Sequence, residues 1–221
     1  MFKFKDINSK DMSVFCKEED FKGRAARVYE EVSIEGRDGS QFETIGYQNY
    51  EISIEMYVRD PNKLDEVLSW LDGQGSLEYE NRITKCWFLS ELDTEDMLGK
   101  AYKLKTKMIR SPFWFKKNDE YIQVQNEIVN EGNVYSKPLL KLQGSGEVEL
   151  SINDVRFIYT FDEDNEVIID CDEMTETYDN IIKSKNMQIG FEYPILQPGI
   201  NIITIHSGNF NIFVKRKDAW L

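Results

Sequence analysis

The stretch NEGNVYSKPLLKLQGSGEVELSIN, which spans residues 130–153, separates two parts of the chain with different sequence patterns. Long predicted strands, one helix and aromatic-rich loops precede it, whereas short predicted strands with turn residues between them follow it. Gly132 and Pro138 suit a change of chain direction, and Gly144-Ser145-Gly146 predicts the turn of the first hairpin after the boundary. We therefore predict two domains, residues 1–129 and residues 130–221, and leave open that the last few residues pack back on the first domain.

The overall composition indicates folded domains rather than a disordered chain. The 221 residues are 41% hydrophobic and 13% aromatic, which is enough to build a core. The apolar runs are too short for a membrane span, and the N-terminal MFKFKDINSK lacks the apolar segment of a secretory signal. The net charge of −13 argues against a nucleic-acid-binding surface, because neutralising phosphates requires clustered Lys and Arg.

Alternating hydrophobic and polar residues predict strands in the N-terminal part. The clearest strand is Asn49–Val58, where every second residue from Ile52 onward is apolar. Gly36 and Gly39 flank Arg37-Asp38, which predicts a tight turn with positive φ. Other predicted strands are Val28–Ile34, Ile83–Leu89, Ala101–Ile109 and Tyr121–Val129.

One helix is predicted after Asp60. Asp60 is a suitable N-cap, and Pro61 suits the first helical position, where its missing N–H costs nothing. Apolar residues between Leu64 and Leu71 fall at helical spacing, and Gly73 is a natural C-terminal stop. A helix this short is marginal in water, so we expect its apolar face to pack on a sheet.

Two segments after this helix are predicted as irregular. Gly73–Asn81 (GQGSLEYEN) is predicted to form a loop, and the acidic Glu91–Asp96 is predicted to form a loop or a single helical turn. The strand that follows places Lys103, Lys105 and Lys107 on one side, which predicts an exposed face or an edge that discourages strand pairing.

The C-terminal part predicts an antiparallel β-sandwich, because its strands are short, closely spaced and separated by turn signals. Two of these turn signals are Gly144–Gly146 and Ser207–Asn209. The predicted strands are Pro138–Leu142, Glu147–Ile152, Val155–Phe161, Glu166–Cys171, Met187–Glu192, Ile200–Ile205 and Phe210–Lys215. The predicted fold class is therefore mainly β, with one short helix in the N-terminal domain.

The residue types needed for catalysis do not form a recognisable motif. His206 is the only histidine and has no nucleophile elbow nearby, so we interpret it as an ordinary surface residue. The three cysteines, Cys16, Cys86 and Cys171, are widely spaced, which indicates neither disulfides nor a thiolate metal site and suits a reducing cytosol. We therefore predict no catalytic, metal-binding or cofactor-binding residues and no cofactor.

An acidic run is the strongest candidate for a cation site. When a calcium-binding EF-hand loop is aligned from Asp162, several carboxylates fall in register, but Val167 occupies the position that needs glycine. A solvated acidic face is the default interpretation, and calcium binding is the alternative. The nine acids of residues 162–179 are Asp162, Glu163, Asp164, Glu166, Asp170, Asp172, Glu173, Glu176 and Asp179.

A sugar-binding sandwich is an alternative function of the second domain, since such modules present exposed aromatic side chains. Most of the available aromatics suit the core instead, and fold class alone does not carry function. The candidates are Tyr159, Phe161, Tyr178, Tyr193 and Phe210.

Several motifs occur in an order that resembles the distal tail protein family of siphophages, the long, non-contractile-tailed bacteriophages. The boundary stretch is similar to the family's domain opening N-x-G-x-x-x-S-x-P followed by G-x-G. The likeness spans nearly the whole chain, without a long insertion in the C-terminal domain. The other matching pieces are IEGRDGS, LSWLDGQGSL, KMIRSPFWF, VIIDCDEMTETY, YPILQPGINIITI and Trp220.

The resemblance implies a non-enzymatic structural protein of the virion, synthesised and assembled in the host cytoplasm. Its N-terminal split-barrel or belt domain would close a single or double hexameric ring around the tail channel, and its galectin-like sandwich would point outward. The ring would join the major tail tube protein to the tail-tip or tail-associated lysin protein and often docks receptor-binding proteins. No membrane and no sequence-specific nucleic-acid binding are implied.

We predict the contact between neighbouring subunits from two features that should project from the belt sheet. One is the predicted turn at Gly36–Gly39, and the other is the row of alternate lysines that begins at Lys103. The residues are Gly36, Arg37, Asp38, Gly39, Lys103, Lys105 and Lys107.

Overall fold

The computed structural model describes residues 1–17, 21–190 and 192–221. Strands account for 59% of the described residues and helices for 7%, which confirms the predicted mainly β class with one short helix. By its contacts the chain divides into two compact units, Met1–Lys117 together with Leu221, and Asn118–Trp220. Within the described ranges, no helix is both long enough and apolar enough to cross a membrane.

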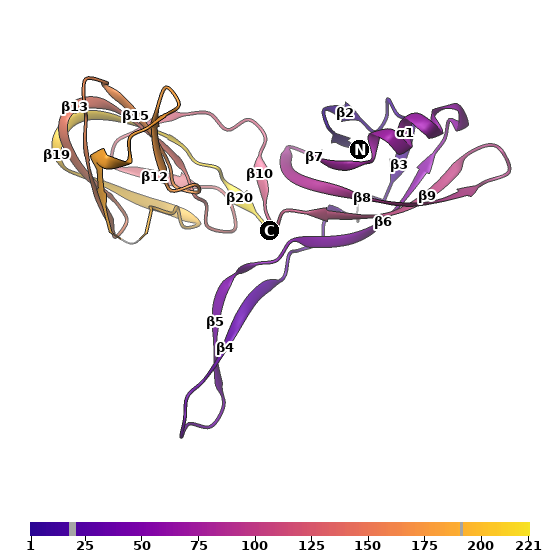
Figure 1. Ribbon diagram of the computed structural model, residues 1–221, viewed down its shortest axis with the longest axis horizontal. Coiled ribbons are helices and arrows are strands. Elements are labelled where there is room, and N and C mark those ends of the chain that lie inside the picture. The colour runs from indigo at the N-terminus through magenta and orange to yellow at the C-terminus, as the bar shows by residue number, and fades with distance from the viewer. Residues whose placement is uncertain (18–20, 191) are drawn as a thin grey trace. The chain divides into compact units, whose positions relative to one another are not determined.

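The first unit is built on one antiparallel sheet, in the strand order β2-β1-β7-β8-β9-β6-β3, with β10 paired to β8 (Figure 1). Alternate residues of β6 and β9, including Met56 and Met108, are fully buried on one face, as the period of two predicts. The elements are β1 (Phe2–Phe4), β2 (Ile7–Asn8), β3 (Val14–Cys16), β4 (Arg27–Ser33), β5 (Ser40–Tyr47), β6 (Tyr50–Val58), the 3-10 helix η2 (Pro61–Lys63), α1 (Leu64–Trp70), β7 (Gly73–Tyr79), β8 (Arg82–Asp96), β9 (Tyr102–Arg110) and β10 (Trp114–Lys116).

The predicted helix is present as the 3-10 helix η2 followed by α1. Asp60 caps η2, because its carboxylate accepts a hydrogen bond from the Asn62 amide at 3.1 Å. Gly73, which begins β7 after α1 ends at Trp70, has a φ of +67°. The helix packs on β1, because the indole of Trp70 stacks on Phe2 with 5.7 Å between ring centroids and donates a hydrogen bond to the Phe4 carbonyl at 2.8 Å. Tertiary packing therefore stabilises a helix too short to be stable alone.

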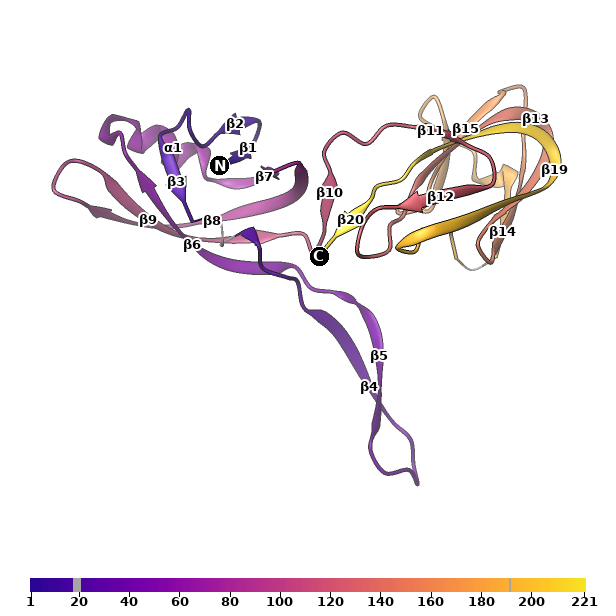
Figure 2. The same ribbon diagram turned by 180° about the vertical axis from the view of Figure 1, so that it is seen from behind.

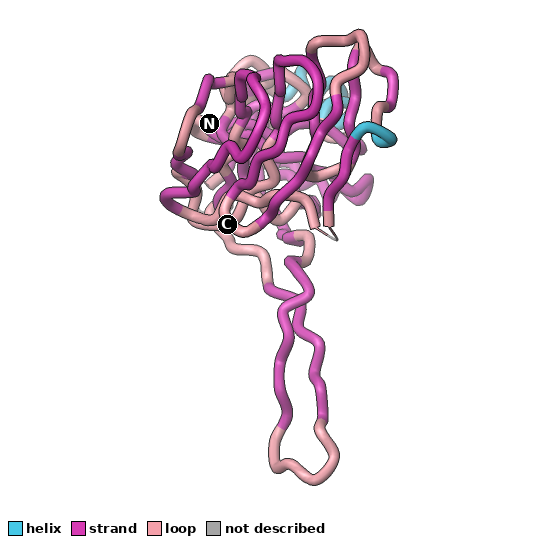
Figure 3. The backbone as a smooth tube through the Cα atoms, turned by 90° about the vertical axis from the view of Figure 1, so that its left-hand side faces the viewer, coloured by secondary structure: helices cyan, strands magenta, loops and turns pink. Residues whose placement is uncertain are grey.

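Strands β4 and β5 form a separate two-stranded sheet, a hairpin that extends away from the sheet of its own unit (Figure 2). The tube view makes the two strands and their connecting loop plain (Figure 3). Val28–Ile34 is confirmed as a strand, but β5 had no counterpart among the predicted strands. The two positive φ values predicted at Gly36 and Gly39 are confirmed at +82° and +83°.

Two loop predictions in the first unit are wrong. Gly73–Asn81 contains strand β7, whose Leu77 and Tyr79 are buried, and its glycines hid this alternation. A Cβ at Gly75 would lie 2.4 Å from the Phe4 ring, so this glycine permits close packing inside a strand. Glu91–Asp96 belongs to β8, where Asp93 and Glu95 pair across the ladder with lysines of β9.

The second unit is a β-sandwich that encloses one hydrophobic core. Its strands belong to one nine-stranded sheet, and buried residues of β13, β14 and β15, such as Leu140, Phe157 and Val167, belong to the same cluster. Of the predicted strand Met187–Glu192, Phe191 lies outside the described residues. The elements are β11 (Ile122–Val124), β12 (Glu127–Asn130), β13 (Leu139–Ile152), β14 (Val155–Thr160), β15 (Glu166–Asp170), β16 (Thr175–Tyr178), β17 (Ile181–Ile182), the 3-10 helix η3 (Ser184–Asn186), β18 (Met187–Ile189), β19 (Gly199–Lys215) and β20 (Ala219–Trp220).

Two turn predictions in this unit are wrong, because Gly144–Gly146 and Ser207–Asn209 lie inside the long strands β13 and β19. The two strands pair with each other on both sides of these segments, and the register shifts between Ser145 and Leu150 leave Gly146 and Gly208 outside the paired positions. The first half of β13 also pairs with β15, and its second half pairs with β14. The glycines therefore form an irregularity at the point where the β13–β19 ribbon changes its neighbour from β15 to β14.

The boundary stretch begins with a fixed bend rather than a flexible linker. The Asn130 side chain is buried and donates hydrogen bonds to the carbonyls of Val134 and Leu196, both at 3.0 Å. A Cβ at Gly132 would lie 2.1 Å from the Ala219 carbonyl oxygen, so glycine is required there. The division by contacts falls at residue 118 rather than 130, because β11 and β12 pair with β19.

Candidate functional site

The β4–β5 hairpin carries the first part of the predicted subunit contact. Residues 36–39 are all exposed at its turn. Along the ribbon, Tyr29, Phe42 and Ile45 are 54%, 65% and 66% exposed. Tyr29 and Phe42 lie on one face with 6.4 Å between ring centroids, and Ile45 is the extra residue at a register shift. Exposed aromatic residues on an isolated ribbon mark a surface for interaction.

The predicted lysine row lies on β9, in the middle of the sheet and not at an edge. Lys105 and Lys107 are exposed, as the alternation predicts. Acids on the two flanking strands face this row, because Asp93 of β8 pairs with Lys105 and Glu51 of β6 lies 3.9 Å from Lys107. The row is therefore part of a mixed-charge face. The hairpin turn and the lysine row belong to different sheets, so the structure does not bring the two predicted contacts together.

Lys103 forms the shortest ion pair of this face. Its Nζ lies 2.9 Å from the Glu55 carboxylate. The hydrogen bond between the two side chains lowers the pKa of Glu55 and raises the pKa of Lys103. Because both groups are close to water, this pair contributes little to stability and more to the charge pattern of the face.

The acidic run of residues 162–179 is distributed over loops and strands of the second unit. Lys183 lies 3.5 Å from Asp162 and 2.5 Å from Asp164, and Lys141 lies 2.8 Å from Glu166. Asp170 accepts hydrogen bonds from the amides of the turn that follows β15. In the part of the chain that the structure describes, no three metal-ligating side chains converge. Lysine side chains and turn amides thus compensate part of the negative charge of this acidic run.

His206 lies on the exposed surface of β19, where its Nε2 is 3.1 Å from the Ser151 Oγ. The cysteines Cys86 and Cys171 are buried, and burial raises the pKa of Cys86 to about 12. Thiols with a raised pKa are poor nucleophiles. Neither of these two buried thiols therefore adds a reactive group to the surfaces described above.

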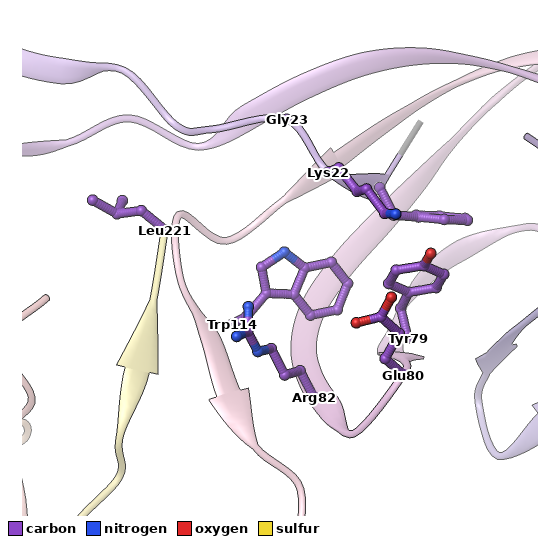
Figure 4. Close-up of a pocket in the computed structure, with 8 residues that line it drawn as sticks. Lys22, Gly23, Tyr79, Glu80, Arg82, Trp114 and Leu221 are labelled. Atoms are coloured by element: carbon purple, nitrogen blue, oxygen red, sulfur yellow. The ribbon is translucent and has the colours of Figure 1, made fainter. Parts of the chain in front are cut away.

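A pocket of about 280 Å³ opens in the first unit (Figure 4). Tyr79 and Trp114 provide aromatic walls, and Lys22 and Arg82 provide cationic groups. Phe21, Gly23, Glu80 and Leu221 complete the lining among the described residues. Sequence reasoning missed this pocket, because its residues come from segments far apart in the chain.

Arg110 lies beneath this pocket wall and was not singled out from the sequence. It is fully buried, and its guanidinium donates hydrogen bonds to the carbonyls of Ser111 at 3.0 Å and Pro112 at 3.1 Å. It also donates to the Gly23 carbonyl, and burial lowers its pKa to about 10. A buried cation held by three carbonyls fixes the segments that carry Gly23 and Trp114.

The turn between β8 and β9 exposes apolar side chains. Leu98 has a φ of +57° and Gly99 a φ of +69°, and the Lys100 amide donates to the Met97 carbonyl at 3.2 Å. Leu98 is 94% exposed and Met97 is 44% exposed. The Asp96 carboxylate accepts a hydrogen bond from the Gly99 amide at 2.7 Å, which fixes the turn.

Comparison with known proteins gives a match to the fold but none to the sequence. No protein-family model matches the chain, and no curated protein matches it significantly. The crystal structure of SPP1 Dit (gp 19.1), described as a paradigm of the hub adsorption apparatus in phages infecting Gram-positive bacteria, matches with a TM-score of 0.72 and 11% identity over 97% of both chains. A chain of the phage P2 baseplate in its activated conformation with Ca matches with a TM-score of 0.42 and 10% identity, over 93% of this chain and 91% of that one. The fold of this chain is thus that of SPP1 Dit.

Proposed function

We propose that this chain is a structural component of a long, non-contractile bacteriophage tail, in which six copies form the distal ring, or hub. The observation that carries the proposal is the match to SPP1 Dit over 97% of both chains, which includes both compact units. The order of sequence motifs supports the same role independently of the fold. Because a fold does not by itself determine function, the exposed surfaces must supply the contacts that a ring requires.

The proposed ring has a tail protein on each side. It joins the major tail tube protein to the tail-tip or tail-associated lysin protein, and receptor-binding proteins dock around it. The chain is accordingly a virion protein that is made and assembled in the host cytoplasm. The proposal gives it no enzymatic role and no cofactor.

The hairpin β4–β5 is the proposed primary contact between neighbouring copies. A two-stranded ribbon is marginal by itself, so burial of the Tyr29 and Phe42 face against the next copy would stabilise it. Its free strand edges can also pair with a neighbour, and a ring uses such edges where a monomer must protect them. The Gly36–Gly39 turn and the row of Lys103, Lys105 and Lys107 are the predicted contact residues.

A ring of this kind has a central channel through which DNA passes. The net charge of −13 per copy would repel the phosphates and limit adhesion of DNA, provided that acidic side chains face the channel. Of the five aromatic residues considered for carbohydrate binding, Tyr159 and Phe161 are buried, and the others (Tyr178, Tyr193 and Phe210) are partly exposed. None of the five is fully exposed, so they do not support the alternative of a carbohydrate-binding module used in host adsorption.

Mass photometry of the purified protein tests the proposed assembly. We expect particles with the mass of six or twelve chains of 26.0 kDa. A protein that stays monomeric at all concentrations up to the micromolar range contradicts the hub.

A further inference from the structure

The sheet of the first unit has two open edges. β3 is a terminal strand of this sheet and pairs only with β6. β7 pairs with β8 only from Arg82 to Phe88, although β8 continues to Asp96. Along Leu92–Asp96, β8 therefore has β9 on one side and no strand of the described chain on the other. The backbone N–H and C=O groups at such an edge can pair with another strand.

The side chains of β8 show that this edge is uncovered. Thr94 pairs with the fully buried Leu104, so the two side chains lie on the same face of the sheet. Thr94 is nevertheless exposed, and Leu92 on the same face is partly exposed. The hydrophobic core of the unit therefore ends before this part of β8.

The other face of the sheet gives the two edges opposite charges. The exposed Asp93 and Glu95 border the open side of β8, and the lysines that pair with them lie one strand further in, on β9. At the β3 edge, the guanidinium carbon of Arg59 lies 3.9 Å from the ring centroid of Phe15. Arg59 is exposed and forms no ion pair with any described residue. Phe15 and Glu95 lie on the same face, because one row of pairs across β6 and β9 joins them.

Only two copies of the chain can join these edges. Within one chain, β6 and β9 lie between β3 and β8. The successive antiparallel pairs make β3 run opposite to β8. Copies related by rotation about an axis along the strands can therefore form an antiparallel ladder between β3 and β8. The opposite charges beside the two strands favour the same pairing.

We propose that β3 of one copy pairs with Leu92–Asp96 of β8 of a second copy, so that the sheet continues from copy to copy. The pairing brings Arg59 beside Asp93 and Glu95. Because the two edges differ, the contact is heterologous, and its repetition closes a ring when the rotation allows it. The inference rests on the proposed function, since it names a contact between copies of the hub in addition to that of the β4–β5 hairpin.

Disulfide formation across the proposed ladder tests this pairing. Cys16 of β3 and Thr94 of β8 lie on one face and in one row of the sheet, through Met56 and Leu104. The Cα atoms of directly opposite residues are about 4.5–5.5 Å apart, which a disulfide can bridge. Under mild oxidation, Thr94→Cys or Leu92→Cys should therefore form a disulfide with Cys16 of the next copy. Because each copy carries both cysteines, non-reducing electrophoresis should show a ladder of up to six chains.

Two controls make the disulfide result specific. Adding Cys16→Ser should abolish the ladder, and Ser69→Cys, at an exposed position of α1, should give none. Rings that form, as measured by mass photometry, without a disulfide at position 92 or 94 overturn this inference and leave the proposed function intact. A protein that remains monomeric overturns both.

Charge reversal tests the contact of Arg59 with the acids of the next copy. Arg59→Glu should lower the association constant by about 10-fold, because it places a carboxylate beside two others. Replacing both Asp93 and Glu95 by Arg in that background should restore association. Lys85→Glu, which reverses an exposed charge on the part of β8 that β7 covers, is the matched control. An equal effect of the two single substitutions, or no restoration, overturns the inference.

Discussion

The guanidinium carbon of Arg110 lies 5.3 Å from the ring centroid of Trp114, and Arg110 has no exposed surface. This contact joins a buried cation to the pocket wall. The cation also reaches the carbonyls of Gly23, Ser111 and Pro112, so it fixes the position of segments far apart in the chain.

Arg110→Lys should destabilise the first unit even though it keeps the charge. Lysine lacks the planar fork that serves several carbonyls at once, so buried acceptors lose their donors. With about 1–3 kcal/mol for each unsatisfied buried group, we expect a loss of roughly 3 kcal/mol in the free energy of unfolding. Urea denaturation measures this loss, with Arg27→Lys on the exposed hairpin as the control. Equal stability of the two variants would show that the carbonyl contacts of Arg110 are unimportant.

Gly208→Ala should destabilise the second unit more than Gly146→Ala. Both glycines have positive φ, so each substitution costs about 1–2 kcal/mol of backbone strain. At Gly208 the new Cβ would also lie 2.7 Å from Val148 and 2.9 Å from the Glu147 carbonyl oxygen, whereas at Gly146 it meets nothing within 4 Å. Thermal unfolding of the two variants measures the difference. The reverse order of stability would contradict the proposed path of the β13–β19 ribbon.

The Glu55–Lys103 pair should give a small pH dependence at low pH. The pKa of Glu55 is lowered from its usual 4.5 in the folded protein, so its contribution is complete above that value and is lost as the pH falls through the folded pKa. The pKa of Lys103 is raised, so its contribution is lost only at strongly alkaline pH. Lys103→Met should flatten the acid side of the stability profile between pH 5 and 3, about the usual pKa range of carboxylates. Unchanged profiles would show that the pair is fully screened by water.

Phe42→Ser should weaken assembly without changing the stability of the monomer. Phe42 is 65% exposed in the single chain, so its removal leaves no cavity there. If the ribbon face is buried against a neighbour, the loss of one aromatic side chain should weaken association by about 2 kcal/mol, or roughly 30-fold. Analytical ultracentrifugation measures this, with Gln41→Ser, at the neighbouring exposed position of the ribbon, as the control. An equal effect of the two substitutions would argue against the aromatic face as the contact.

Local patterns in the sequence predict much of the fold of the first unit. The alternation in Asn49–Val58 and the cap at Asp60 depend only on neighbouring residues, and both predictions are confirmed, with Asp60 capping the 3-10 helix η2 that precedes α1. Strand β7 escaped prediction because its glycines serve tight packing, and glycine is also the commonest sign of a loop. The distinction needs the position of Phe4, which lies far away in the sequence.

The ambiguity of glycine also explains the two wrong turn predictions in the second unit. A glycine at a turn and a glycine at an irregularity within a strand look the same in the sequence. Only the pairing of β13 with β19 shows that these glycines lie within strands. The candidate surfaces were harder to predict. The alternation identified the exposed lysines of β9, but the acids that face Lys105 and Lys107 come from β6 and β8. Nothing local marks Arg110 as buried or Leu98 as exposed, because both depend on non-local contacts.

Negative-stain electron microscopy of the purified chain tests the hub most directly. A hexameric hub should give class averages with six-fold symmetry and a central opening, and Phe42→Ser should reduce the fraction of rings while Gln41→Ser should not. Monomers alone, or closed assemblies with another symmetry, would show that this chain does not build a hexameric distal ring.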